Sequence, residues 1–149
     1  MYFEDYVPGN VSRLRTDTFS EASIMEFARQ YDPQEFHINP GAAARGPYGG
    51  VIASGWHTCA LAGHALVTEY LSPVSSLPSP GIDEVRFRTP VRAGDTLTWW
   101  ATVLVARASR STPSSGIVRT LVEAVNQDGS LAASMTAINL MRRRPVAGT

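Results

Sequence analysis

The sequence predicts an α+β fold in which a curved antiparallel sheet wraps one long central helix. Three observations lead to this prediction. Small and apolar residues fill a long run over 55–70, β-prone segments fill nearly everything after residue 82, and short turns join the last of these segments. Because parallel strands need long crossover connections, the short turns favour antiparallel pairing. The 149 residues are expected to form one domain, spanning 1–149.

The first expected element is a short helix that begins near residue 20. Thr18 and Glu21 have the spacing of a capping box, and Ser20 is itself a favourable N-cap residue. Apolar residues then recur at helical spacing on one face: Ile24, Phe27 and Ala28. The helix is expected to end before Pro33, because the residue that precedes a proline disfavours the helical conformation.

The central helix is expected to lie between two loops. The segment from Asp32 to Gly50 is rich in proline and glycine and is predicted to be a loop. The helix begins at Ser54 or Gly55 and reaches roughly Tyr70. Apolar or small residues lie nearly all round it, so we expect other structure to bury it on most sides. Prolines and serines predict a second, surface loop over 72–81.

Four strands are expected after this second loop, over 82–89, 96–108, 117–125 and 131–141. Apolar and charged residues alternate in the first of them, as in a half-buried strand. The run Asn126-Gln127-Asp128-Gly129 is a strong signal for a hairpin turn. Trp99 and Trp100 must point to opposite faces of the second strand, so we expect one in the core and the other at a contact between chains.

The composition excludes several classes of function. Acids and bases balance at 13 each, so no overall charge attracts the chain to nucleic acid or to an anionic membrane. The chain contains no lysine, which excludes a Schiff-base mechanism. Its single cysteine, Cys59, excludes an internal disulfide and a thiolate-clustered zinc site, and no metal is expected. No secretory or membrane-spanning segment is visible, so a cytoplasmic location is expected.

One carboxylic acid and one imidazole are the residues of this sequence that most strongly indicate a function. Asp32 and His37 are five residues apart around a proline turn, so their side chains can converge on one small reacting atom. Gly55 opens the central helix, where backbone N–H groups and the positive end of the helix dipole favour a developing oxyanion. An acid, a base and an oxyanion site together suit proton chemistry next to a carbonyl group.

These residues and their order resemble the MaoC-like dehydratases, also called (R)-specific enoyl-CoA hydratases, which have the hotdog fold. The family pattern runs from a Phe-Ala helix through an Asp-x-Asn-Pro-x-His loop to an Ile-Ala-His-Gly segment. This chain has Phe27-Ala28, then the loop 32–37, then Ile52-Ala53-Ser54-Gly55, and its segment 90–95 matches the family's Pro-Val-x-x-Gly-Asp turn. The loop lacks the family's Asn-Pro pair, and Ser54 stands where the hydratases often have His.

The resemblance implies reversible addition of water to a trans-2-enoyl thioester, which gives an (R)-3-hydroxyacyl thioester. Asp32 and His37 would be catalytic and would jointly hold the water, while the Gly55 N–H would face the thioester oxygen. Ser54 and Trp56 would complete the oxyanion and substrate-binding region. The family also implies a homodimer with the substrate in a tunnel near the subunit interface, and no cofactor beyond the coenzyme A or carrier-protein part of the substrate.

The sequence leaves several choices open. It assigns neither the base within the Asp32–His37 pair nor the length and branching of the acyl chain. Hotdog proteins also include thioesterases, whose carboxylate usually lies on the central helix, but the first acid on this helix is Glu69, near its far end. A third alternative is a non-catalytic subunit of a hetero-oligomeric dehydratase, although such subunits usually lose the Asp/His pair.

Other chemically capable residues are interpreted as structural. His57 and His64 are seven residues apart on the central helix and are expected to pack rather than to bind a metal, and Cys59 is expected to be a small core residue. Glu35 is expected to face solvent. The run 142–144, all arginine, is expected to be a solvated tail rather than a contact for coenzyme A phosphates.

Overall fold

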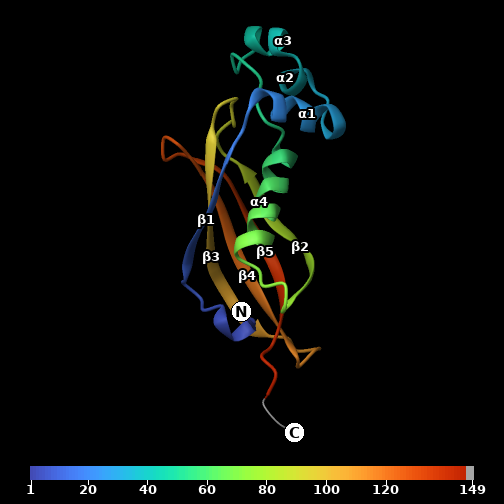
Figure 1. Cartoon of the computed structure of the whole chain (residues 1–149), viewed down its shortest axis with the longest axis vertical. Coiled ribbons are helices and arrows are strands. Elements are labelled where there is room, and N and C mark those ends of the chain that lie inside the picture. Colours follow the sequence, from blue (N-terminus) through green and yellow to red (C-terminus); the bar gives the residue numbers. More distant parts are fainter. Residues whose placement is uncertain (147–149) are drawn as a thin grey trace.

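The computed structural model describes residues 1–146, and a single five-stranded sheet forms its framework (Figure 1). The strand order is β1-β3-β4-β5-β2, and every neighbouring pair is antiparallel. The strands are β1 (Val11–Thr18), β2 (Ser76–Phe87), β3 (Thr96–Ala108), β4 (Ser115–Asn126) and β5 (Leu131–Arg142). This sheet confirms the antiparallel arrangement expected from the short turns.

The helices lie along one face and at one end of this sheet. They are η1 (Phe3–Asp5), α1 (Glu21–Tyr31), α2 (Glu35–Ile38), α3 (Pro40–Arg45) and α4 (Gly55–Glu69). Figure 1 shows α4 lying along the sheet, with α1, α2 and α3 grouped beyond its N-terminal end and the chain's N-terminus near the opposite end. A long helix wrapped by an antiparallel sheet is the hotdog fold, as predicted. None of the helices within residues 1–146 combines the length and the apolar character needed to cross a bilayer.

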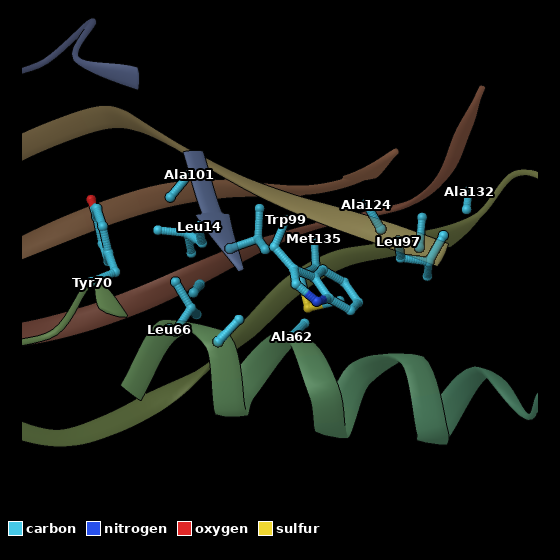
Figure 2. Packing of buried hydrophobic residues seen from close by; sticks show 14 of the residues in the cluster. Leu14, Ala62, Leu66, Tyr70, Leu97, Trp99, Ala101, Ala124, Ala132 and Met135 are labelled. Carbon is cyan, nitrogen blue, oxygen red and sulfur yellow. The ribbon is translucent and has the colours of Figure 1, made fainter. Parts of the chain in front are cut away.

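The main core lies between α4 and the sheet (Figure 2). Alternate residues of β3 point into it, and the largest of them is Trp99, which is completely buried. Figure 2 shows the Trp99 ring and Met135 of β5 above Ala62 of α4. Because Ala62 is small, the helix can approach the sheet closely enough to cover a tryptophan.

The sequence analysis did not anticipate β1. Only Leu14 and Asp17 of this edge strand are buried, so its composition shows little apolar alternation. The Trp99 indole N–H donates to Asp17, which gives that buried carboxylate a partner in the core. Thr18 ends this strand and pairs with Thr96, so the capping-box prediction is wrong. The prediction for Ser20 is confirmed, because its hydroxyl accepts the Ser23 backbone N–H at the start of α1.

The predicted loop over 72–81 is also wrong over its second half, because β2 begins at Ser76. This strand is at the edge of the sheet, where proline can be tolerated, and its register with β5 shifts between Leu77 and Gly81. A second shift lies between Asp83 and Arg86, and Glu84 there has a φ of 54°. Such bulges bend a strand and change the direction of the side chains that follow.

The remaining differences concern helices. The predicted loop 32–50 contains the two short helices α2 and α3, so part of the segment is packed rather than freely exposed. The helix α4 has nearly the predicted bounds, but within one chain it is not buried on most sides. Its outer face carries Trp56 and Val67, which are 69% and 65% exposed. The sheet covers one side of α4, and α1 contacts it elsewhere, which leaves this outer face open.

Candidate active site

The structure brings Asp32 and His37 into contact. Asp32 caps the C-terminal end of α1, and His37 lies in α2, directly after the proline turn. The His37 Nε2 atom is 3.2 Å from the Asp32 Oδ2 atom. The His37 ring is buried, so the expectation that this residue lies on an open loop is wrong. The short helix α2 packs against α1 and turns the imidazole inward.

A backbone carbonyl orients the His37 ring. The Nδ1 atom lies 2.6 Å from the Ile52 carbonyl oxygen. Because a carbonyl oxygen can only accept a hydrogen bond, this contact requires the proton of neutral imidazole to be on Nδ1. The Nε2 atom, which faces Asp32, is therefore the atom that is free to take up or release a proton. At 3.2 Å, Nε2 and Oδ2 are within direct hydrogen-bonding distance, so the two atoms can share one proton.

The Asp32 carboxylate is held by three side chains. Its Oδ1 atom accepts from the Gln34 amide at 2.7 Å, and its Oδ2 atom accepts from the Ser54 hydroxyl at 2.7 Å as well as contacting His37. These hydrogen bonds, first that of Gln34 and then that of Ser54, lower the pKa of Asp32 below its usual range. Asp32 is therefore a carboxylate at neutral pH and can stabilise positive charge on His37.

The N-terminus of α4 lies next to this pair. Ser54 is fully buried, and its hydroxyl accepts the Trp56 N–H while it donates to Asp32. The next residue, Gly55, lies against the ring of Phe87, and a Cβ atom placed on Gly55 would be 2.4 Å from that ring. The Gly55 N–H has no acceptor among the described residues, so this donor at a helix N-terminus is available to a ligand.

A pocket of about 330 Å³ joins these features. His37, Gly55 and Phe87 line it, together with ten further residues: Tyr48, Ile52, Ala53, Thr58, Arg88, Thr89, Pro90, Val91, Ala132 and Ala133. The wall combines apolar side chains with polar groups, among them His37 and the α4 N-terminus, and such polar groups can orient a small-molecule ligand. The floor and rim come from segments far apart in the sequence: α2, α4, the end of β2 and the start of β5.

The predicted site residues divide into those that line this pocket and those that do not. His37 and Gly55 line it, whereas Asp32 contacts His37, and Ser54 donates to Asp32. Trp56 lies outside it and lines a second, apolar pocket together with Phe27, Tyr31 and Ala60.

Sequence reasoning missed three residues of the site. Gln34 lies in the loop 32–37, and its position two residues after Asp32 is the local signal for the hydrogen bond between the two side chains. Phe87 and Arg88 lie in the predicted strand 82–89 and line the pocket. No local pattern connects them to His37, since only the tertiary fold brings the end of β2 to α4.

The other chemically capable residues lie apart from the pocket. His57 is buried, with its ring stacked on Phe27 at 4.7 Å between centroids, and burial lowers its pKa. His64 is exposed and contacts Arg15, so the two histidines have different surroundings. Cys59 is only partly buried, although it packs against the core, and Glu35 is exposed as expected.

The arginines 142–144 are not a free tail. Arg142 ends β5, Arg143 pairs with Glu4, and Arg144 pairs with Asp5. Figure 1 shows this end of the chain far from α1, α2 and α3, so these arginines do not reach the pocket of their own chain.

Comparison with known proteins identifies the family of this chain. The family model described as "MaoC like domain" matches residues 5–126. The MaoC-like dehydratase of Rhodospirillum rubrum has the same fold, with a TM-score of 0.90 and 33% identity over 98% of this chain and 99% of that chain. A 3-hydroxybutyryl-CoA dehydratase of Methylorubrum extorquens is 34% identical over 64% of this chain and 59% of its own length.

More distant structures share the fold. The (R)-hydratase PhaJ1 of Pseudomonas aeruginosa has a TM-score of 0.80 and 22% identity, over 99% of this chain and 92% of that chain. The ChsH1-ChsH2 complex of Mycobacterium tuberculosis, an assembly of two named components, contains a chain with a TM-score of 0.73 and 20% identity, over 91% of this chain and 98% of that chain.

The fold is the hotdog fold of the MaoC-like proteins. The chain belongs to the MaoC-like domain family.

Proposed function

We propose that the chain is a hydratase that adds water reversibly to a trans-2-enoyl thioester and forms an (R)-3-hydroxyacyl thioester. The observation that carries this proposal is the His37 imidazole, which is oriented by the Ile52 carbonyl, contacts Asp32 and lines the pocket beside the Gly55 N–H. Membership in the MaoC-like family and similarity to a 3-hydroxybutyryl-CoA dehydratase support the proposal.

In the hydration direction, one water molecule supplies both the hydroxyl group that is added to Cβ and the proton that is added to Cα. The Asp32–His37 pair holds the water, and the oxygen of that water forms a bond to Cβ of the enoyl group while its proton passes to the pair. The electron pair of the C=C bond moves toward the thioester oxygen, where the Gly55 N–H and the helix dipole stabilise the negative charge. The pair then returns one proton to Cα. Because Asp32 stays ionised, it stabilises an imidazolium on His37 between these two steps.

In this mechanism, His37 and Asp32 together accept the proton of the water. The Ile52 carbonyl leaves Nε2 as the nitrogen that exchanges protons, and Asp32 Oδ2 lies next to that atom. We assign no cofactor to this reaction beyond the coenzyme A or carrier-protein part of the substrate, because each group that the reaction needs is provided by the chain.

The test is the loss of ultraviolet absorbance of the conjugated enoyl thioester, with crotonyl-CoA and longer or branched enoyl-CoAs. We expect turnover by the wild type and a fall in kcat of about 10²–10⁴-fold in Asp32→Asn and in His37→Ala, which is the usual contribution of general acid–base catalysis. His64→Ala is the matched control, because His64 lies on α4 but outside the pocket. Separation of the product enantiomers checks the (R) assignment.

Two other outcomes would contradict the proposal. Release of free thiol without formation of a hydroxyacyl thioester would indicate a thioesterase. Unchanged turnover in His37→Ala would reject the mechanism.

We also propose that the chain functions as a homodimer or a higher homo-oligomer, in the cytoplasm. Apolar or small residues form a line along the outer face of α4, and each is at least partly exposed in the single chain: Trp56, Ala60, Gly63 and Val67. A helix with an apolar outer face is normally covered by other structure. A second copy of the chain is the partner that we assign to this face.

A further inference from the structure

Arg88 is a charged residue on the wall of the candidate active site that neither the sequence reasoning nor the proposed reaction uses. It directly follows β2, and its backbone N–H donates to the Ala132 carbonyl at 2.8 Å, so the sheet fixes the position of its main chain. Arg88 is an exposed residue, and it lines the pocket together with His37 and Gly55.

The guanidinium of Arg88 has no partner within residues 1–146. Arg119 and Arg143, by contrast, pair with carboxylates of their own chain, and Arg92 donates to the Tyr48 carbonyl at the same pocket. A guanidinium offers five N–H donors and keeps its charge at any physiological pH. Arg88 therefore has its full capacity to bind an anionic group.

The pocket wall contains no carboxylate that could neutralise this charge. Apart from His37, its polar lining consists of hydroxyl and backbone groups, with Tyr48, Thr58 and Thr89 as the hydroxyl residues. A pocket with one fixed positive charge and no carboxylate on its wall favours a ligand that carries an anionic oxygen group.

We propose that Arg88 determines substrate specificity by binding an anionic oxygen group of the thioester substrate. This inference rests on the proposed function, since it places that group relative to the reacting thioester. The group can be a carboxylate on the acyl chain or a phosphate of the carrier. The pocket favours the carboxylate, because the pantetheine arm of coenzyme A holds the phosphates far from the thioester, whereas Arg88 shares a small pocket with His37 and Gly55. The substrate class is then an enoyl thioester with a carboxylated acyl group.

The test compares matched substrates that differ either in the carboxylate of the acyl group or in the phosphates of the carrier. Crotonyl and glutaconyl thioesters differ only by a carboxylate on the terminal carbon. Each is prepared with coenzyme A and with N-acetylcysteamine, which lacks all phosphates. We measure kcat and KM of the wild type, of Arg88→Gln and of Arg86→Gln. The last variant is the control, because Arg86 is an exposed arginine two residues away that donates to the Val85 carbonyl and does not line the pocket.

We expect the wild type to prefer glutaconyl over crotonyl thioesters with both carriers. In Arg88→Gln this preference falls about ten- to a hundredfold, mainly through KM, which is the size expected for hydrogen bonds to a charged group. Arg88→Lys keeps the charge but loses the bidentate geometry, so its preference for glutaconyl thioesters lies between that of the wild type and that of Arg88→Gln. Arg86→Gln keeps the wild-type preference.

The other outcomes are also decisive. An Arg88→Gln effect on both coenzyme A esters but on neither N-acetylcysteamine ester supports an anion-binding Arg88 and assigns the carrier phosphate as its ligand. Equal kinetic constants for the wild type and Arg88→Gln on all four substrates overturn the inference.

Failure of the proposed reaction is recognised separately. If the wild type hydrates none of the four esters and releases no free thiol from butyryl-CoA or glutaryl-CoA, calorimetric binding of these two compounds still tests Arg88, because neither contains a double bond that can be hydrated. A preference for glutaryl-CoA that Arg88→Gln abolishes supports the inference without hydration. The inference is overturned if the wild type and Arg88→Gln bind glutaryl-CoA with the same affinity and butyryl-CoA with the same affinity.

Discussion

At the scale of single residues, the most consequential arrangement is the set of hydrogen bonds around Asp32. Gln34 binds one carboxylate oxygen, while Ser54 and His37 contact the other. Each of these contacts favours the ionised carboxylate over the protonated form, and Gln34 makes the largest contribution to the lowered pKa of Asp32. Gln34 does not line the pocket, so it acts on the reaction only through Asp32.

Replacement of Gln34 by alanine is expected to move the acidic limb of the pH–activity profile to higher pH. Without the amide donor the pKa of Asp32 rises toward its ordinary value, so protonation inactivates the pair at a higher pH than in the wild type. The measurement is kcat/KM for an enoyl thioester from about pH 2 to 7, because the lowered pKa of Asp32 and its ordinary value of about 3.9 both lie at the acidic end of this range. Gln30→Ala, at an exposed position near the end of α1, is the control. Superimposable profiles for Gln34→Ala and the wild type would show that Gln34 does not tune Asp32.

At the scale of elements, the active site depends on how closely the end of β2 approaches the beginning of α4. The Phe87 ring occupies the space that a side chain at position 55 would need. Glycine at this position therefore serves two purposes, because it permits the contact with Phe87 and leaves its N–H at the pocket wall. The β-bulge that precedes Phe87 bends the strand next to this contact.

The variant Gly55→Ala is expected to fold but to lose activity. The added methyl group must displace Phe87 or the first turn of α4, and a displacement of this kind near the reacting atoms can lower kcat/KM by about 10²-fold. The same substitution made together with Phe87→Ala should have a smaller effect, because the conflicting ring is absent.

Gly50→Ala controls for the glycine substitution itself, since a Cβ atom there meets no atom within 4 Å. Enzyme kinetics and thermal unfolding are measured for the wild type, for each single variant and for the double variant. If Gly55→Ala causes the same loss in the wild-type chain as in the chain that already carries Phe87→Ala, the steric argument is contradicted.

At the scale of the whole molecule, the outer face of α4 is exposed to solvent in the single chain. The sheet buries the inner face, with Ala62 and Ala65 completely inaccessible, while Trp56 and Val67 stay exposed three turns apart on the outer face. The second apolar pocket, of about 470 Å³, begins at Trp56 and continues onto α1. This distribution gives the single chain an apolar surface on the helix that also carries Gly55.

We expect the wild-type chain to have a native mass of two or more copies, measured by sedimentation or by light scattering. Val67→Asp should shift this distribution toward the single chain, because burying an unpaired carboxylate in an apolar contact costs several kcal/mol at about neutral pH. Val7→Asp introduces the same charge at another exposed valine, outside α4, and should leave the mass unchanged. A wild-type protein that sediments as one chain at all concentrations would reject the homo-oligomer.

The main elements and four of the residues that meet at the site could be predicted from the sequence: Asp32, His37, Ser54 and Gly55. Periodicity, turn residues and the capping serine at position 20 act over a few residues, so α1, α4 and strands β3 to β5 could be predicted from the chain. The edge strand β1 could not, because edge strands bury few residues and so show little alternation. The first half of β2 was obscured by prolines that an edge strand tolerates.

The assembly of the site depends on contacts between segments that are distant in the sequence. The spacing of Asp32 and His37 suggested that they could meet, but the Ile52 carbonyl that selects the exchangeable nitrogen is fifteen residues away from the imidazole. Ser54 reaches Asp32 across 22 residues, and Phe87 and Arg88 reach the pocket only because β2 returns along the sheet to α4. Contacts of this kind depend on packing between distant segments, and no local preference of the backbone or side chains encodes them.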